Sequence, residues 1–167
     1  SLHCHPKKKT GFVILSGKAS IQLGLWKNTQ KIFRAPSKLM IRNRLFHSIK
    51  SLSKKGTCLM EIETPSDKKD LVRYKDSYGR EKKPYESLKF TKKISKNDII
   101  FKKTKKKIIQ KYNFGNKVEL SLETHKNFKK INKEKMKTIF AIVNGGINDK
   151  SNRSVLSLGD IIRTGTL

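Results

Sequence analysis

The sequence predicts an all-β protein, because it consists of many short strand-like runs and contains no long amphipathic helix. Residues 11–15 are apolar throughout, as in a fully buried strand. Residues 18–23 alternate, with Ala19, Ile21 and Leu23 on one face and polar residues on the other. Together these patterns indicate a barrel or a sandwich.

The remaining runs extend this pattern along the chain. Further strands are expected at 39–41, 45–49, 58–62, 117–122, 138–143, 155–158 and 161–163. Residues 66–86 interleave Asp, Arg and Tyr, which predicts an ordered loop held by Arg–carboxylate pairs. Residues 89–107 are the most basic and least patterned, which predicts a linker, with a short helix over 98–112 capped by Asn97.

An internal repeat links the two halves of the chain. The segment Thr10–Gly17 aligns with Thr138–Gly145, and Thr, Phe, Ile and Gly coincide in the two copies. Each copy ends in a turn signal, Ser16-Gly17 or Asn144-Gly145. We therefore expect two copies of one β module, in which residues 10–24 and 138–148 form equivalent hairpins.

The composition is strongly basic, with a formal net charge of +27 and a pI near 10.3. Such charge favours nucleic-acid binding. However, 33 of the basic residues are Lys and only 7 are Arg, and their doublets are scattered. No zinc-finger, RNA-recognition or helix-turn-helix pattern accompanies them. We expect only non-specific binding to polyanions.

Several classes of protein are disfavoured by what the sequence lacks. It contains no run of about 18 apolar residues, so no membrane span is expected. Cys4 and Cys58 are too few to staple a disulfide scaffold. Because the first residue is not Met, we expect a fragment cut at both ends.

Three of the four histidines suggest a metal site. On a strand, His3 and His5 would share one face, with Cys4 on the other, and His47 lies in a later strand-like run. Such a set is a reasonable ligand shell for a divalent transition metal, whereas a lone histidine is more often structural. Glu61 and Glu63 also share a strand face, either as a carboxylate pair or facing solvent.

These residues resemble motifs of the cupin superfamily. The run His3-Cys4-His5, with Thr10 and Gly17, is similar to its first motif, HxH followed by Glu and then Gly. Residues 42–47 stand where its second motif, PxGxxH, would lie, and residues 158–162 resemble the segment leading into that motif. The chain thus resembles a bicupin: two double-stranded β-helix (jelly-roll) barrels in tandem, the second truncated. Residues 1–88 would form the first barrel, 89–112 a basic linker and 113–167 the partial second barrel.

The resemblance carries functional expectations. The residues of 63–80 resemble a segment of bacterial cupins linked to surface-sugar biosynthesis. This implies a cytoplasmic protein that binds or transforms a small polar molecule, a sugar or nucleotide-sugar, as an isomerase, epimerase or dioxygenase-like enzyme, and it allows a homodimer. One alternative is a non-catalytic cupin that serves as a binding or structural module. The other is a basic protein associated with nucleic acid.

The departures from the motifs modify these expectations. Thr10 stands in the usual Glu position, and Arg42 and Arg44 replace Pro and Gly. We expect His3, His5 and His47 to hold Fe, Mn, Ni or Zn without that carboxylate, and the two arginines to bind a phosphate or carboxylate of the ligand. In the second copy the equivalent positions are Ile131, Lys133 and Thr138, so no metal is expected there, and His125 lies outside the register.

Overall fold

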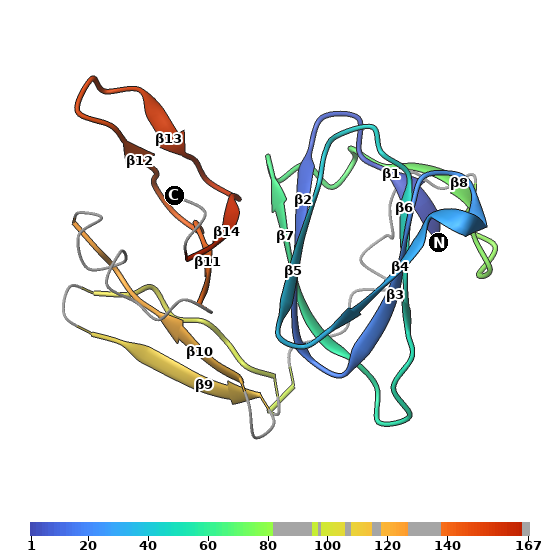
Figure 1. Cartoon of the computed structure of the whole chain (residues 1–167), viewed down its shortest axis with the longest axis horizontal. Helices are drawn as coiled ribbons and strands as arrows, with labels where there is room; N and C mark the ends of the chain where they lie inside the picture. The colour runs from blue at the N-terminus through green and yellow to red at the C-terminus, as the bar shows by residue number, and fades with distance from the viewer. Residues whose placement is uncertain (82–94, 97, 106–107, 115–117, 127–137, 165–167) are drawn as a thin grey trace.

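The chain is mostly β, and every strand pairing found in it is antiparallel (Figure 1). The computed structural model describes residues 1–81, 95–96, 98–105, 108–114, 118–126 and 138–164. The elements of the first half are β1 (Leu2–Cys4), β2 (Lys9–Ser16), β3 (Lys18–Leu23), the short 3-10 helix η1 (Lys27–Thr29), β4 (Gln30–Arg34), β5 (Ser37–Ile41), β6 (His47–Ser51), β7 (Cys58–Thr64) and β8 (Val72–Lys75). Those of the second half are β9 (Gln110–Phe114), β10 (Val118–Leu122), β11 (Ile139–Ala141), β12 (Ile147–Asn148), β13 (Ser154–Leu156) and β14 (Ile161–Arg163).

The first half folds into two sheets that face each other. The five-stranded sheet has the order β4-β3-β6-β1-β8, and the three-stranded sheet has the order β5-β2-β7. Phe12, Ile14 and Ile41 project from the smaller sheet and pack against Ala19 and Ile21 of the larger one. The predicted all-β class is confirmed. Among the described strands, however, the two sheets remain separate and do not close into a barrel.

Residues 11–15 of strand β2 are apolar because both faces of the strand are covered. Phe12 and Ile14 face the larger sheet, whereas Val13 and Leu15 point the other way and pack against Ile161 of the second half. Strand β3 has only one apolar face in the core, which explains why its sequence alternates.

The second half covers the outer face of the three-stranded sheet. Its described strands form three pairs, β9 with β10, β11 with β14, and β12 with β13. Two polar contacts fix it there: Lys9 Nζ lies 2.6 Å from Asp160 Oδ1, and Lys38 Nζ donates to the Ile161 carbonyl at 3.0 Å. The two halves therefore share one apolar layer and at least two polar links.

The repeat in the sequence corresponds to a repeated strand topology. In the first copy β2 pairs with β5 and, between them in sequence, β3 pairs with β4. In the second copy β11 pairs with β14 and β12 pairs with β13 in the same nested order. The glycines that end the two aligned segments both have positive φ, 80° at Gly17 and 73° at Gly145.

The prediction that these segments are hairpins is wrong. Strand β2 pairs with β5 and β7, and β3 pairs with β4 and β6, so the Gly17 turn carries the chain from one sheet to the other. Only glycine fits there, since a Cβ would lie 2.7 Å from the Gly56 carbonyl oxygen as well as requiring positive φ. The Asn144-Gly145 turn likewise separates two strands with different partners.

Other expectations had mixed outcomes. The helix predicted over 98–112 is wrong for the described residues. Strand β9 begins at Gln110, and the burial of its residues alternates with the period of a strand. The loop at 66–86 contains the predicted Arg–carboxylate pair, Arg80 Nη2 to Asp76 Oδ1 at 2.9 Å, but it also contains the unforeseen strand β8.

The boundary at residue 88 lies outside the described residues, so the domain division stays a prediction. Within those residues, a search for helices able to cross a membrane found none.

Candidate metal centre

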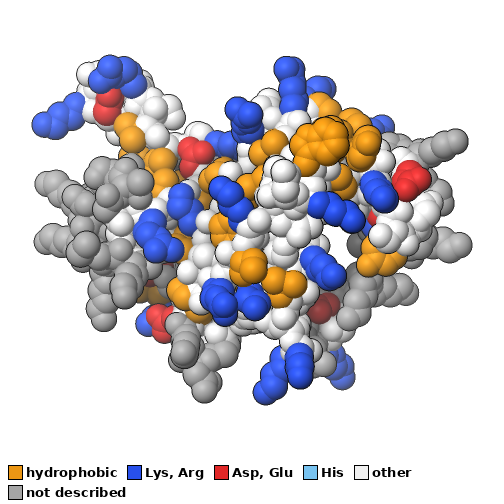
Figure 2. All heavy atoms as spheres, turned by 45° about the vertical axis from the view of Figure 1, so that its right-hand side comes forward, with side chains coloured by type: hydrophobic (Ala, Val, Ile, Leu, Met, Phe, Trp, Pro, Cys, Tyr) orange, Lys and Arg blue, Asp and Glu red, His pale blue; other side chains and the backbone are white. Residues whose placement is uncertain are grey.

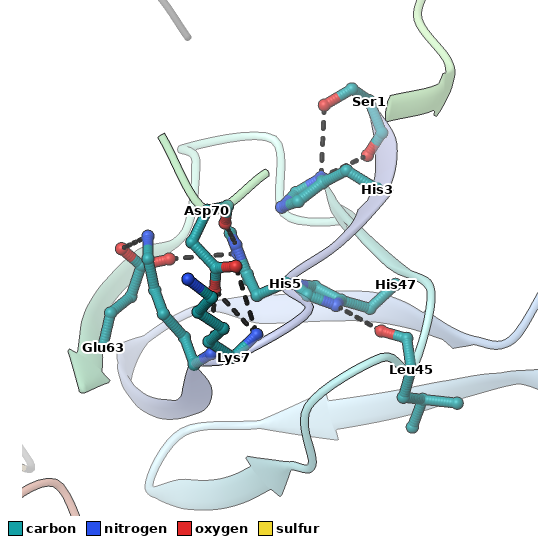
Figure 3. Close-up of polar contacts among 9 residues, drawn as sticks. Ser1, His3, His5, Lys7, Leu45, His47, Glu63 and Asp70 are labelled. Carbon is teal, nitrogen blue, oxygen red and sulfur yellow. Dashed lines mark hydrogen bonds and ion pairs between the residues drawn. The ribbon is translucent and has the colours of Figure 1, made fainter. Parts of the chain in front are cut away.

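Three histidines meet inside the first half, at one end of the two sheets (Figure 3). Strand β1 lies beside β6, and His3 is directly opposite His47 in their antiparallel register. Residues opposite each other in a sheet share a face, and His5 lies on the same face by its spacing from His3. The ring centroids are 4.5 Å apart for His3 and His47, 5.1 Å for His3 and His5, and 5.5 Å for His5 and His47. The predicted convergence is therefore found.

The orientation of each ring is set by a backbone carbonyl. His5 Nδ1 lies 2.6 Å from the Asp70 carbonyl oxygen, and His47 Nδ1 lies 3.0 Å from that of Leu45. His3 Nδ1 lies 3.3 Å from the Ser1 carbonyl oxygen. A carbonyl only accepts, so Nδ1 carries the proton in the His5 and His47 contacts and Nε2 is left for other partners. His3 Nδ1 also lies 3.2 Å from the Ser1 hydroxyl, which can donate or accept. Metal-binding histidines are commonly oriented in this way.

Among the three histidines, His47 gives the strongest indication of a metal site. It is 2% exposed, and its Nε2 has no hydrogen-bond partner in the described part of the chain. Burial lowers the pKa of His47, and burial together with the nearby His47 lowers the pKa of His3 to about 3. At neutral pH both rings are uncharged, and each offers an Nε2 lone pair.

A carboxylate reaches the histidines from a strand that the motif comparison did not consider. In the register of β2 with β7, Thr10 lies opposite Glu63, so their side chains share a face. Glu63 Oε1 lies 3.0 Å from His5 Nε2. Thr10 itself is buried, and its Oγ1 has no hydrogen-bond partner among the described residues. Glu63 thus places a carboxylate beside His5, while the predicted ligand set of His3, His5 and His47 stays a prediction.

Glu63 is held between two cationic partners. Lys8 Nζ, on a buried side chain, lies 2.8 Å from Glu63 Oε2, while His5 contacts Oε1. The hydrogen bond from His5 and the contact with Lys8 lower the pKa of Glu63 to about 2, against the opposing effect of burial. Burial also lowers the pKa of His5, but the hydrogen bonds to Glu63 and to the Asp70 carbonyl outweigh it, so the net shift is upward. Without a metal, His5 is therefore the most easily protonated of the three rings.

Glu61 extends this group toward the surface. It lies two residues before Glu63 on the same face of β7, and it is exposed. The ligand atoms of His3, His5 and His47 lie within 4.8 Å of one another, and so do those of His5, Glu61 and Glu63. The pKa of Glu61 is raised, first by the partial desolvation of its carboxyl and then by the nearby charge of Glu63. We call these five residues the His–Glu cluster; either overlapping group could hold a metal ion.

Asp70 fixes the chain between the histidines and β2. Its carboxylate accepts hydrogen bonds from the backbone N–H of Lys7 at 3.0 Å and of Lys8 at 2.8 Å, and its carbonyl orients His5. Its side chain is buried. The sequence placed Asp70 in the polar loop at 66–86, but no spacing predicts its contacts with residues more than sixty positions earlier.

Of the two arginines predicted to bind ligand, Arg44 contacts the cluster through its backbone. The Arg44 N–H donates to the His5 carbonyl at 2.8 Å, so it is the backbone of Arg44 that supports the site. Both side chains line a shallow pocket with Asn43 and Leu45, and no described hydrogen bond joins either guanidinium to the cluster. Ligand binding by the two arginines stays a prediction.

The second copy brings no comparable group together in the described residues. Thr138 precedes β11, whereas Ile131 and Lys133 lie outside the described residues. His125 Nε2 pairs with the neighbouring Glu123 at 3.2 Å. The predicted absence of a second metal site therefore stays a prediction.

Comparison of the chain with protein-family models, with curated protein sequences and with solved structures found no match. The cupin relationship accordingly rests on the motif residues and remains a proposal.

Proposed function

We propose that this chain is a cupin-like jelly-roll protein in which His3, His5 and His47 hold a divalent transition-metal ion, with Glu63 as the adjoining carboxylate. One observation carries the proposal: three imidazoles converge within one sandwich, each with Nδ1 on a backbone carbonyl, and the buried Nε2 of His47 has no hydrogen-bond partner among the described residues. Such an arrangement of donors suits Fe, Mn, Ni or Zn.

The residues of the His–Glu cluster differ in whether they must lose a proton before they bind the ion. His3 and His47 are uncharged near neutral pH, and Glu63 is ionised, because their pKa values are shifted in those directions. His5 must give up the proton that it shares with Glu63. A bound ion would act as a Lewis acid toward an oxygen of the ligand. Glu61, at the exposed end of the cluster, is the group best placed to exchange a proton with a bound molecule.

The ligand class follows from the resemblance and from the polar cluster. Carboxylate and imidazole groups at one end of a sandwich favour a small polar molecule. The expected sugar or nucleotide-sugar, the isomerase, epimerase or dioxygenase-like reaction, the cytoplasmic location and the homodimer are parts of the proposal that depend on the cupin resemblance.

A non-catalytic binding module is the second candidate, and one feature favours it. His5, Glu63 and Lys8 already form ion-pair contacts of 3.0 and 2.8 Å with one another without any metal. This network does not reach His47 Nε2, which leaves a buried polar atom unsatisfied, at a cost of about 1–3 kcal/mol. We therefore favour the metal site.

Isothermal titration of the metal-free protein with Zn²⁺ and Mn²⁺ would test the proposal. We expect one ion per chain, binding weakened at least 100-fold by His47→Ala, and unchanged binding in His125→Ala, which removes a histidine outside the cluster. Equal affinity in all three proteins would reject the site. Circular dichroism spectra of the two variants would show that the fold is retained.

A further inference from the structure

We propose that the groove between the two halves of the chain binds a phosphate-bearing small molecule. The groove has a volume of about 750 Å³ and lies where the start of β2 and the ends of β5 and β7 meet the turn before β14. Its wall includes the cationic side chains of Lys7, Lys9 and Arg42.

Polar contacts and close packing hold the second-half side of the groove against the first half. Lys9 Nζ contacts both Asp160 Oδ1, at 2.6 Å, and Ser157 Oγ, at 3.1 Å. Asp160 Oδ2 in turn accepts the backbone N–H of Ser157 at 2.7 Å. Gly159 lies so close to β7 that a Cβ on it would be 2.4 Å from Thr64 Cγ2. The groove is therefore a formed junction between the halves.

Two of its three cations have no anionic partner among the described residues. Asp160 neutralises Lys9. In contrast, no acidic side chain among the described residues pairs with Lys7 Nζ or with the guanidinium of Arg42, although both line the groove. The Arg fork offers paired N–H donors and the Lys a point charge, and together they suit a phosphate dianion better than a single carboxylate. The amide of Asn43 adds a neutral polar group beside them.

The groove also has an apolar part, which indicates that the phosphate is attached to an organic group. Met40, Pro65 and Leu158 line it, and Leu158 is 46% exposed. Sites for small organic ligands typically combine such a surface with a few polar anchors, in volumes of roughly 300–1,000 Å³.

This groove is separate from the His–Glu cluster. Glu63 and Thr10 point into the sandwich, whereas the next pair in the register, Thr64 and Lys9, points to the opposite face. Phosphate binding in the groove is accordingly expected with or without a metal ion, and the two proposals can fail independently.

Charge alone does not identify the site, since Lys and Arg side chains are spread over the face seen in Figure 2. The test therefore needs a control with the same loss of charge. Lys7→Ala/Arg42→Ala removes the two groove cations, and Lys54→Ala/Lys55→Ala removes two exposed lysines from the β6–β7 connection. Both double variants lower the net charge equally.

Calorimetric titrations would use EDTA-treated protein at about 0.15 M salt, where long-range attraction is screened. The probes are phenyl phosphate, inorganic phosphate and benzoate. We expect phenyl phosphate to bind most tightly, with its affinity reduced about tenfold or more in Lys7→Ala/Arg42→Ala and less than twofold in Lys54→Ala/Lys55→Ala. Equal losses in the two double variants would overturn the proposal. Equal binding of benzoate, or phosphate binding that requires added Zn²⁺, would also overturn it.

Discussion

His5 Nε2 and Glu63 Oε1 lie 3.0 Å apart, joining the loop after β1 to the end of β7 across the open end of the sandwich. The contact connects a ring from the predicted motif with a carboxylate that the motif does not contain. It raises the pKa of His5 and lowers that of Glu63, so the contact favours the charged form of each partner. A metal ion would have to replace the proton in this contact.

Replacing Glu63 with Gln is expected to change both partners. The pKa of His5 should fall, because its ionised acceptor is lost while its burial remains. Metal affinity should decrease about 10–100-fold. NMR titration of the imidazole signals and calorimetry would measure the two effects. Glu119→Gln, at an exposed carboxylate paired with Lys111, is the matched control, and a similar change in that variant would refute the assignment.

Metal binding should release close to one proton per ion at pH 6. His5 alone has a raised pKa, while His3, with a pKa of about 3, and His47, with a lowered pKa, are already deprotonated. Affinity should consequently weaken as the pH falls below the His5 pKa. Calorimetry in buffers of different ionisation enthalpy counts the protons. A release of two or three protons would show that more than one histidine is protonated before metal binds, contrary to these pKa shifts.

The same pair should make the metal-free protein most stable in mildly acidic solution. Because the pKa of Glu63 is lowered to about 2, its contribution is present above the unfolded value of 4.5 and is lost as the pH falls toward 2. Because the pKa of His5 is raised, its contribution is complete below 6.5 and is lost as the pH rises through the folded value. Urea unfolding at pH 3, 5.5 and 8.5 should show both losses, and Glu63→Gln should reduce them. Identical pH profiles for the two proteins would contradict this expectation.

Gly159→Ala should weaken the docking of the second half. The residue has φ +86°, and a Cβ would meet Thr64 Cγ2 at 2.4 Å. Gly56→Ala is a matched control, since φ is +85° and nothing lies within 4 Å of its Cβ. The unfolding free energy should fall by about 1–3 kcal/mol more in Gly159→Ala than in the control, which isolates the steric overlap from backbone strain. Equal losses in urea unfolding would indicate that the contact does not support the interface.

The all-β class and most strand positions could be predicted because they depend on local periodicity. Strand β3 alternates and residues 11–15 of β2 are apolar, and both patterns reflect burial directly. Which strands pair is a long-range property, so the sequence suggested a β2–β3 hairpin where the chain in fact crosses between sheets. The histidine pattern identified three of the five residues of the His–Glu cluster. Glu63 could not be assigned, because its position depends on the register of β7 against β2.

Elemental analysis of the protein, purified without chelators, tests the central claim most directly. We expect close to one equivalent of a single transition metal in the wild type and in His125→Ala, and less than about a tenth of an equivalent in His47→Ala. Less than a tenth of an equivalent in the wild type, even after incubation with Fe²⁺, Mn²⁺, Ni²⁺ and Zn²⁺ in turn, would contradict the metal centre and leave the binding module.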